Sequence, residues 1–213
     1  KAVSVREDGG AELVKNIAGV PAPVVMDPVF LLSPDEWKKI ASQPVVKEEY
    51  VLCYYMNTPD KTIHSSIASV ANALAQKHGC KVINIGKKEF ERLKFWENNL
   101  FDVGPREFLS LVMNAKYVVT NSFHATAFSC IFHVPFFVPV NYEEPEEKRL
   151  SNRMESLVQK FQCAERIISC PVHEANVMSK IQELDVMNFE TVDRTIMEHR
   201  NKSIAFLEKA LFE

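Results

Sequence analysis

Short apolar runs alternate with longer amphipathic segments between residues 50 and 140, and this alternation constrains the fold more than any other feature of the chain. The apolar runs predict strands, and the segments with a 3.6-residue apolar period predict helices. Strands are expected at 50–56, 81–85, 117–120 and 135–138. Helices are expected between them at 61–78, 104–114 and 122–133. A β-α-β-α-β-α-β order predicts an α/β fold, a Rossmann-like parallel sheet with helices on both faces.

The first 49 residues contain a smaller β-α-β pattern and a linker. Strands are expected at 2–5 and 24–26, with Gly9-Gly10 ending the first and a helix at 12–18 between them. A second helix is expected at 34–41, because Ser33 can cap it, Pro34 suits its first position and Glu36 completes a capping box. The polar residues 42–49 contain a proline and predict a linker.

The last third of the chain is predicted to be mostly helical. Helices are expected at 149–161, 173–184 and 189–211, with a short strand at 165–168. Residues 86–103 are polar and rich in aromatic side chains, and they show no clear period. The chain starts directly on the strand predicted at 2–5, so we expect that further sequence precedes it in the natural protein.

Composition excludes several classes of protein. The net charge of −3 argues against a general attraction to nucleic acid. No run of 18 apolar residues exists, so no membrane span is expected. The five cysteines include no Cys-x-x-Cys pair, and Cys53 and Cys130 lie in apolar runs, which favours reduced, structural thiols in a cytoplasmic protein. His and Cys do not cluster at ligand spacing, so no metal is expected.

The segment from Thr120 to Thr126 joins a predicted strand to a predicted helix and is the first candidate site. In parallel sheets, ligands bind where strands end and helices begin. Asn121 or Ser122 can cap the helix, free N–H groups there suit a phosphate or carboxylate, and His124 in the first turn suits a general acid. The alternative is a capped helix with a partly buried histidine.

Two arginines and an aspartate are further candidates. Arg6 follows the strand at 2–5, and its guanidinium can bind a carboxylate or phosphate with two parallel hydrogen bonds. It can equally pair with Glu7, Asp8 or Asp27. Asp27 precedes a proline at a strand end, which favours a structural turn over substrate contact. Arg153 either reaches a ligand or pairs with a nearby acid.

Several stretches, taken in order, resemble the polysaccharide pyruvyl transferase family, from its middle to its C-terminus. They are Ser4-Val5-Arg6-Glu7, Val25-Met26-Asp27-Pro28, Gly104-Pro105-Arg106-Glu107, Thr120-Asn121-Ser122-Phe123-His124-Ala125-Thr126, Arg153 to Leu157 and Arg200-x-x-Ser203-x-x-Phe206-Leu207. The resemblance covers nearly the whole chain. Each stretch is weak by itself, whereas their order and spacing are specific.

The resemblance implies a C-terminal half of a GT-B-type fold, with 1–33 as the last β-α-β piece of an N-terminal domain and 34–213 as the C-terminal Rossmann-like domain with its terminal helices. It implies transfer of pyruvate from phosphoenolpyruvate to a sugar as a cyclic ketal, in surface or exopolysaccharide biosynthesis, without a cofactor or metal. The acceptor is a sugar or a lipid-linked or nucleotide-linked glycan. The enzyme is expected in the cytoplasm, with a position near the inner membrane surface left open, and this chain alone is expected to be inactive.

By the same resemblance, His124 is the active-site histidine and Arg6 handles phosphoenolpyruvate. Asn121, Ser122, Phe123 and Arg153 are the other expected substrate contacts. Ala125 stands where many members have Gly, and Ser122-Phe123 stands where some have Arg-Leu, so a phosphate-contacting arginine of those members is missing. Ser122, the helix N-terminus and Arg153 are expected to substitute. The alternatives are a GT-B nucleotide-sugar glycosyltransferase and a non-catalytic sugar-binding or interaction domain.

Overall fold

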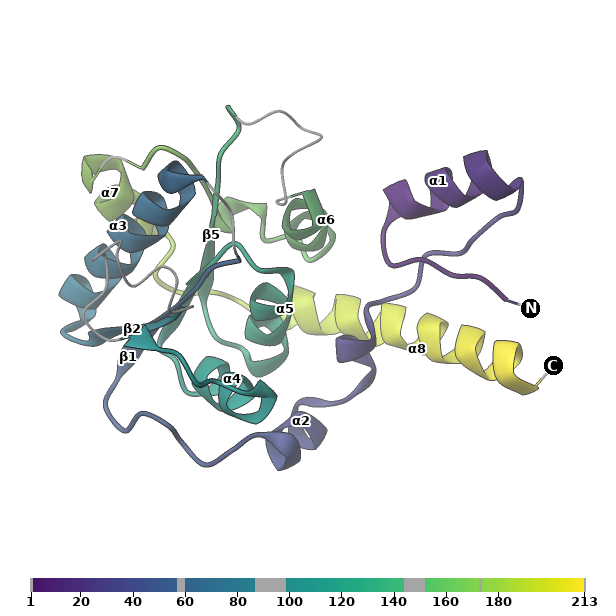
Figure 1. Ribbon diagram of the computed structural model, residues 1–213, viewed down its shortest axis with the longest axis horizontal. Coiled ribbons are helices and arrows are strands. Elements are labelled where there is room, and N and C mark those ends of the chain that lie inside the picture. Colours follow the sequence, from purple (N-terminus) through teal and green to yellow (C-terminus); the bar gives the residue numbers. More distant parts are fainter. Residues whose placement is uncertain (1, 57–59, 87–98, 144–151, 173, 213) are drawn as a thin grey trace.

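A six-stranded, fully parallel sheet forms the centre of the computed structural model, which describes residues 2–56, 60–86, 99–143, 152–172 and 174–212 (Figure 1). The strands lie in the order β3-β2-β1-β4-β5-β6. Their bounds are β1 Tyr50–Tyr54, β2 Lys81–Ile85, β3 Asn99–Leu100, β4 Tyr117–Thr120, β5 Phe136–Val140 and β6 Ile167–Ser169. This order is the one expected of a Rossmann-like fold. The predicted α/β class and parallel sheet are therefore confirmed.

Helices cover both faces of the sheet, as predicted. They are α1 Asp8–Ala18, α2 Pro34–Ile40, α3 Lys61–His78, α4 Pro105–Met113, α5 Phe123–Phe132, α6 Asn152–Lys160, α7 Glu174–Glu183 and α8 Glu190–Phe212, with short 3-10 turns at η1 Pro28–Leu31 and η4 Ala164–Arg166. Side chains alternate across each strand. Val51 and Cys53 of β1 therefore pack against α3 and α7, whereas Leu52 packs in the core formed with α4, α5 and α6.

The helix ends follow from local sequence. Ser33 and Glu36 form the predicted capping box at the start of α2. Gly79 adopts a left-handed conformation, with φ of 64°, and ends α3 at the predicted residue. In the predicted linker, the Ser42 N–H donates to the Arg106 carbonyl over 3.0 Å, which fixes this segment against α4.

Several predicted bounds are wrong. The strands at 2–5 and 24–26 reduce to one parallel bridge between Val5 and Val24. Helix α1 starts at Asp8 and includes Gly9-Gly10, because the first turn of a helix needs few intrahelical hydrogen bonds and tolerates glycine there. The strand at 50–56 ends at Tyr54, and the strand at 165–168 is the turn η4 followed by β6.

Most of the stretch at 86–103, for which no element was predicted, lies outside the described residues. The part that is described includes β3. Most of the acidic run after Asn141, and the first residues of the helix predicted at 149–161, also lie outside them. The division of the chain at residue 33 stays a prediction.

The last helix, α8, joins the end of the chain to its beginning. The Met26 N–H donates to Ser203 Oγ over 2.9 Å, and this hydroxyl donates to the His199 carbonyl over 2.8 Å. The first part of α8 packs against the sheet core through Val192, while its second half runs past η1 toward the side of the molecule where both termini lie (Figure 1). The residues just before η1 are thus fixed by α8.

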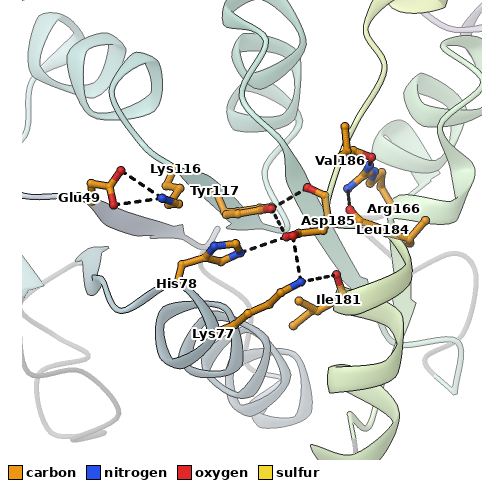
Figure 2. Close-up of polar contacts among 10 residues, drawn as sticks. All are labelled: Glu49, Lys77, His78, Lys116, Tyr117, Arg166, Ile181, Leu184, Asp185 and Val186. Atoms are coloured by element: carbon orange, nitrogen blue, oxygen red, sulfur yellow. Dashed lines mark hydrogen bonds and ion pairs between the residues drawn. The ribbon is translucent and has the colours of Figure 1, made fainter.

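A polar cluster lies at the amino-terminal end of β4, at the opposite end of the strands from the loops that follow them (Figure 2). The Asp185 carboxylate accepts a hydrogen bond from the Tyr117 hydroxyl at 2.6 Å and lies 3.1 Å from both Lys77 Nζ and His78 Nε2. The buried Arg166 guanidinium donates to the carbonyls of Leu184 and Val186 over 2.7 and 3.0 Å. The cluster therefore fixes the connection between α7 and α8 to the sheet.

Replacing Asp185 with Asn should destabilise the fold at neutral pH and much less in acid. The Tyr117 hydrogen bond, followed by Lys77 and His78, holds the pKa of Asp185 below its ordinary value. A carboxylate with a lowered pKa stabilises the fold above its unfolded-state pKa of about 3.9, and this contribution disappears as the pH falls through the native value. We expect a loss of about 1 kcal/mol in unfolding free energy at pH 7, because the side chain is partly exposed.

Urea denaturation of both proteins at pH 7 and at pH 3.5 measures this difference. A gap between the two proteins that is as large at the lower pH would contradict this account of Asp185. Asp35→Asn is the control, because the Asp35 side chain on α2 is 84% exposed.

Candidate functional site

The strand order reverses between β1 and β4, and the loops that follow these two strands are joined by side chains. The Thr120 hydroxyl donates to the Tyr54 carbonyl, and Asn121 Oδ1 accepts from the Met56 N–H over 2.7 Å. In open α/β sheets this reversal at the carboxyl ends of the strands is where ligands bind. The N-terminus of α5 is held at this position.

The first turn of α5 is not capped by a side chain, contrary to prediction. Ser122 occupies the N-cap position but accepts no hydrogen bond from the turn, and Asn121 is already bound to the loop after β1. Both side chains are buried, and the Ser122 N–H donates to Thr120 Oγ1 over 2.9 Å. The Ser122 side chain therefore does not cap the N–H groups that open α5.

A buried carboxylate, Asp27, lies between two of the predicted site residues. Its Oδ2 forms an ion pair with the Arg6 guanidinium and lies 3.8 Å from His124 Nε2. The guanidinium carbon of Arg6 also lies 5.6 Å from the centre of the Phe123 ring. Asp27 is 3% exposed at its side chain, whereas His124 is 53% exposed. The fold therefore brings together Arg6, Phe123 and His124 around Asp27, although 97 residues separate Asp27 from His124 in sequence.

A pocket of about 320 Å³ opens beside this cluster, between the start of α1, η1, α5 and α6. Its lining includes four apolar residues, three cations and three acids. The apolar residues are Met26, Phe30, Phe123 and Leu157. The charged residues are Arg6, Arg153 and Lys160 with Glu7, Asp8 and Asp27. The volume suits a small, charged organic ligand.

Three of the six predicted site residues line this pocket. These are Arg6, Phe123 and Arg153; His124 borders the pocket through Asp27, whereas Asn121 and Ser122 do not line it. Arg153 Nε lies 3.3 Å from Glu7 Oε1. Both arginines thus form the ion pairs that were the alternatives to ligand contact, and both still face the pocket.

The sequence made Asp27 a candidate but favoured a structural turn over substrate contact, because Asp27 stands before Pro28. The turn exists, since Asp27 Oδ1 accepts from the Val29 N–H at the start of η1 over 3.1 Å. The signal for a second role was the position of Asp27 after the segment 24–26, in parallel with Arg6 after the segment 2–5.

Neither a metal-binding cluster nor a membrane-spanning helix is found in the described part of the chain. Within it, no group of three or more His, Cys, Asp or Glu side chains lies close enough together to hold a metal ion. None of its helices is long and apolar enough to cross a membrane.

The parallel sheet, its strand order and the helices on both faces define one half of a GT-B-type fold. Methanocaldococcus jannaschii UDP-GlcNAc 2-epimerase, solved with UDP-GlcNAc and UDP, shares the fold with a TM-score of 0.55 and 15% identity, over 84% of this chain and 54% of the epimerase. Phytolacca americana UGT2, complexed with UDP-2fluoro-glucose and pterostilbene, matches with a TM-score of 0.43 and 15% identity, over 95% of this chain and 48% of its own. The chain thus spans about half the length of these structures.

The family model of the polysaccharide pyruvyl transferases matches residues 1–144, and the chain belongs to that family. No curated protein matches the chain. The matched residues include α1, Asp27 and the start of α5, and they end before α6.

Proposed function

We propose that the natural protein carrying this chain transfers pyruvate from phosphoenolpyruvate to two hydroxyls of a sugar, forming a cyclic ketal and releasing phosphate. Membership of the family supports a transferase, and the observation that carries the donor assignment is the charged pocket beside Asp27. Phosphoenolpyruvate offers a carboxylate and a phosphate. Arg6, Arg153 and Lys160 provide three cations around one small volume.

The reaction needs an anion site and a proton. In our proposal Arg6 and the uncapped N–H groups of α5 hold the donor, and His124 protonates C3 while a sugar oxygen bonds to C2. The first hydroxyl gives up its proton to solvent in this step, and His124 takes one proton back from solvent before the next turnover. The second hydroxyl then bonds to C2 as the bond from C2 to the phosphate oxygen breaks, and its proton leaves with phosphate. His124 suits the role of acid because it is half-exposed, next to the pocket, with a carboxylate nearby.

The acceptor belongs to the same proposal. The acceptor is a sugar, or a lipid-linked or nucleotide-linked glycan of a surface or exopolysaccharide. It receives pyruvate as a cyclic ketal in the cytoplasm. Donor binding by the 213-residue chain alone is expected to be weak, and turnover is expected to be absent, if the acceptor contacts lie on a second half of the fold.

Replacing Arg6 with Ala should weaken phosphoenolpyruvate binding by about 10- to 100-fold, because a charge-assisted hydrogen bond to a ligand contributes about 1.5–3 kcal/mol. Calorimetric titration of the natural protein with phosphoenolpyruvate measures this effect, and a parallel titration of the 213-residue chain compares the two. Arg194→Ala is the matched control, since Arg194 lies exposed on α8 and does not line the pocket.

The main rival is a nucleotide-sugar glycosyltransferase on the same fold, since fold alone does not determine the substrate. The same calorimetric titration with UDP-GlcNAc separates the two. Binding of UDP-GlcNAc together with no binding of phosphoenolpyruvate would sink the pyruvyl donor.

A further inference from the structure

We propose that Asp27 is a positioning residue of this reaction: its carboxylate orients His124, balances the charge of the protonated imidazole ring, and links that charge to donor binding through an oxygen shared with Arg6. The inference rests on the proposed function. It assigns a role to a residue outside the predicted site, and it couples donor binding to the uptake of a proton.

Two hydrogen bonds hold Asp27 in place, one to its Oδ1 atom and one to the backbone just before it. Oδ1 accepts from the Val29 N–H over 3.1 Å, and the preceding Met26 N–H is held by Ser203 of α8 over 2.9 Å. The carboxylate therefore has little freedom to rotate, and Oδ2 stays directed at Arg6 and His124. His124 Nε2 lies 3.8 Å from this fixed, buried carboxylate, beyond hydrogen-bond distance but within range of an ion pair. The carboxylate therefore attracts the ring when the ring is protonated, and this attraction favours one ring orientation.

The shared oxygen makes Arg6 and His124 competitors for one negative charge. Without donor, the Arg6 guanidinium neutralises Asp27. When the carboxylate and phosphate of a donor attract the guanidinium, more of the Asp27 charge acts on the imidazole 3.8 Å away. Donor binding should therefore favour the protonated form of His124, the form that gives a proton to C3.

The other charges around the pocket act in the same direction. Three cations (Arg6, Arg153 and Lys160) and three acids (Glu7, Asp8 and Asp27) line the pocket, so their formal charges cancel before the donor arrives. A donor with a carboxylate and a phosphate dianion makes the pocket strongly negative, which stabilises an added proton. We therefore expect the protein to take up a proton from solvent when the donor binds at pH 8.

Calorimetric titration of the natural protein with phosphoenolpyruvate at pH 8, in Tris and in HEPES, measures this uptake, because the two buffers differ in ionisation enthalpy. We expect a buffer-dependent binding enthalpy for the wild type and a clearly smaller buffer dependence for Asp27→Asn. The Asn oxygen can still accept from Val29, so the turn should fold. Its dissociation constant should stay within about threefold of wild type, because Arg6 remains. Its kcat should fall about 100-fold.

Asp35→Asn on the exposed face of α2 is the matched control and should behave like the wild type. Wild-type binding with no buffer dependence would overturn the inference and leave the proposed function standing, whereas no binding at all would overturn both. Equal losses of affinity and kcat in Asp27→Asn would show a merely structural residue. If that variant fails to fold, His124→Asn decides, since proton uptake that persists in it overturns the proposal.

Discussion

His124→Asn should lower the rate of phosphate release from phosphoenolpyruvate by about 100- to 10,000-fold, the contribution expected of one general acid. The donor should still bind with nearly unchanged affinity, because Arg6 and the N–H groups that open α5 hold its charges. The measurement is the steady-state release of phosphate by the natural protein, with the glycan fraction of the source cells as acceptor, and a donor titration of the same variant.

The control for this substitution lies at the other end of the same helix. His133 follows α5 with a φ of 57° and pairs with Asp193 over 2.7 Å. Asparagine tolerates this left-handed conformation, so His133→Asn should leave the rate near wild type. Equal losses in both variants, or full activity in His124→Asn, would remove His124 from the mechanism.

Arg166→Met should destabilise the fold by about 2–4 kcal/mol without changing donor affinity in the protein that remains folded. The residue is 1% exposed, its guanidinium makes two hydrogen bonds to the carbonyls of Leu184 and Val186, and it lies over the Phe137 ring at 5.5 Å. Methionine fills a similar volume and donates no hydrogen bond, so the connection between α7 and α8 is released from the sheet.

Urea denaturation followed by circular dichroism gives the free energy of unfolding for this comparison. Arg194→Met serves as the control, because Arg194 is exposed and its nearest hydrogen-bond partner, Thr191 Oγ1, lies at 3.4 Å. A loss below about 0.5 kcal/mol in Arg166→Met, the range of an ordinary surface substitution, would contradict the structural role of this cluster.

The centre of the fold was predictable because its strands and helices differ in the period of their apolar residues, and because capping residues mark the helix ends. Helix α3 begins and ends at the predicted residues, since Asp60 caps its start and Gly79 ends it. The N-terminal strands were not predictable, because a short apolar run such as 2–5 becomes a strand only if a neighbour pairs with it. Here one bridge between Val5 and Val24 forms.

The candidate site, too, was predictable from the sequence only in part. Arg6 and Arg153 were predicted from their sequence positions and Phe123 from the family resemblance, and the fold brings all three to one pocket. The capping role of Asn121 and Ser122 was wrong, because Met56, on the loop after β1, takes the Asn121 side chain. Asp27 was a candidate for which a turn was favoured, and its shared contact with Arg6 and His124 was not predictable, because this contact depends on how three distant segments pack.

Mass spectrometry of the glycan fraction incubated with the natural protein and phosphoenolpyruvate tests the central claim most directly. The account predicts glycans that gain one pyruvate less one water, with one phosphate released for each ketal formed. Glycans that gain a sugar residue from a supplied nucleotide sugar, while phosphoenolpyruvate stays unconsumed, would contradict it.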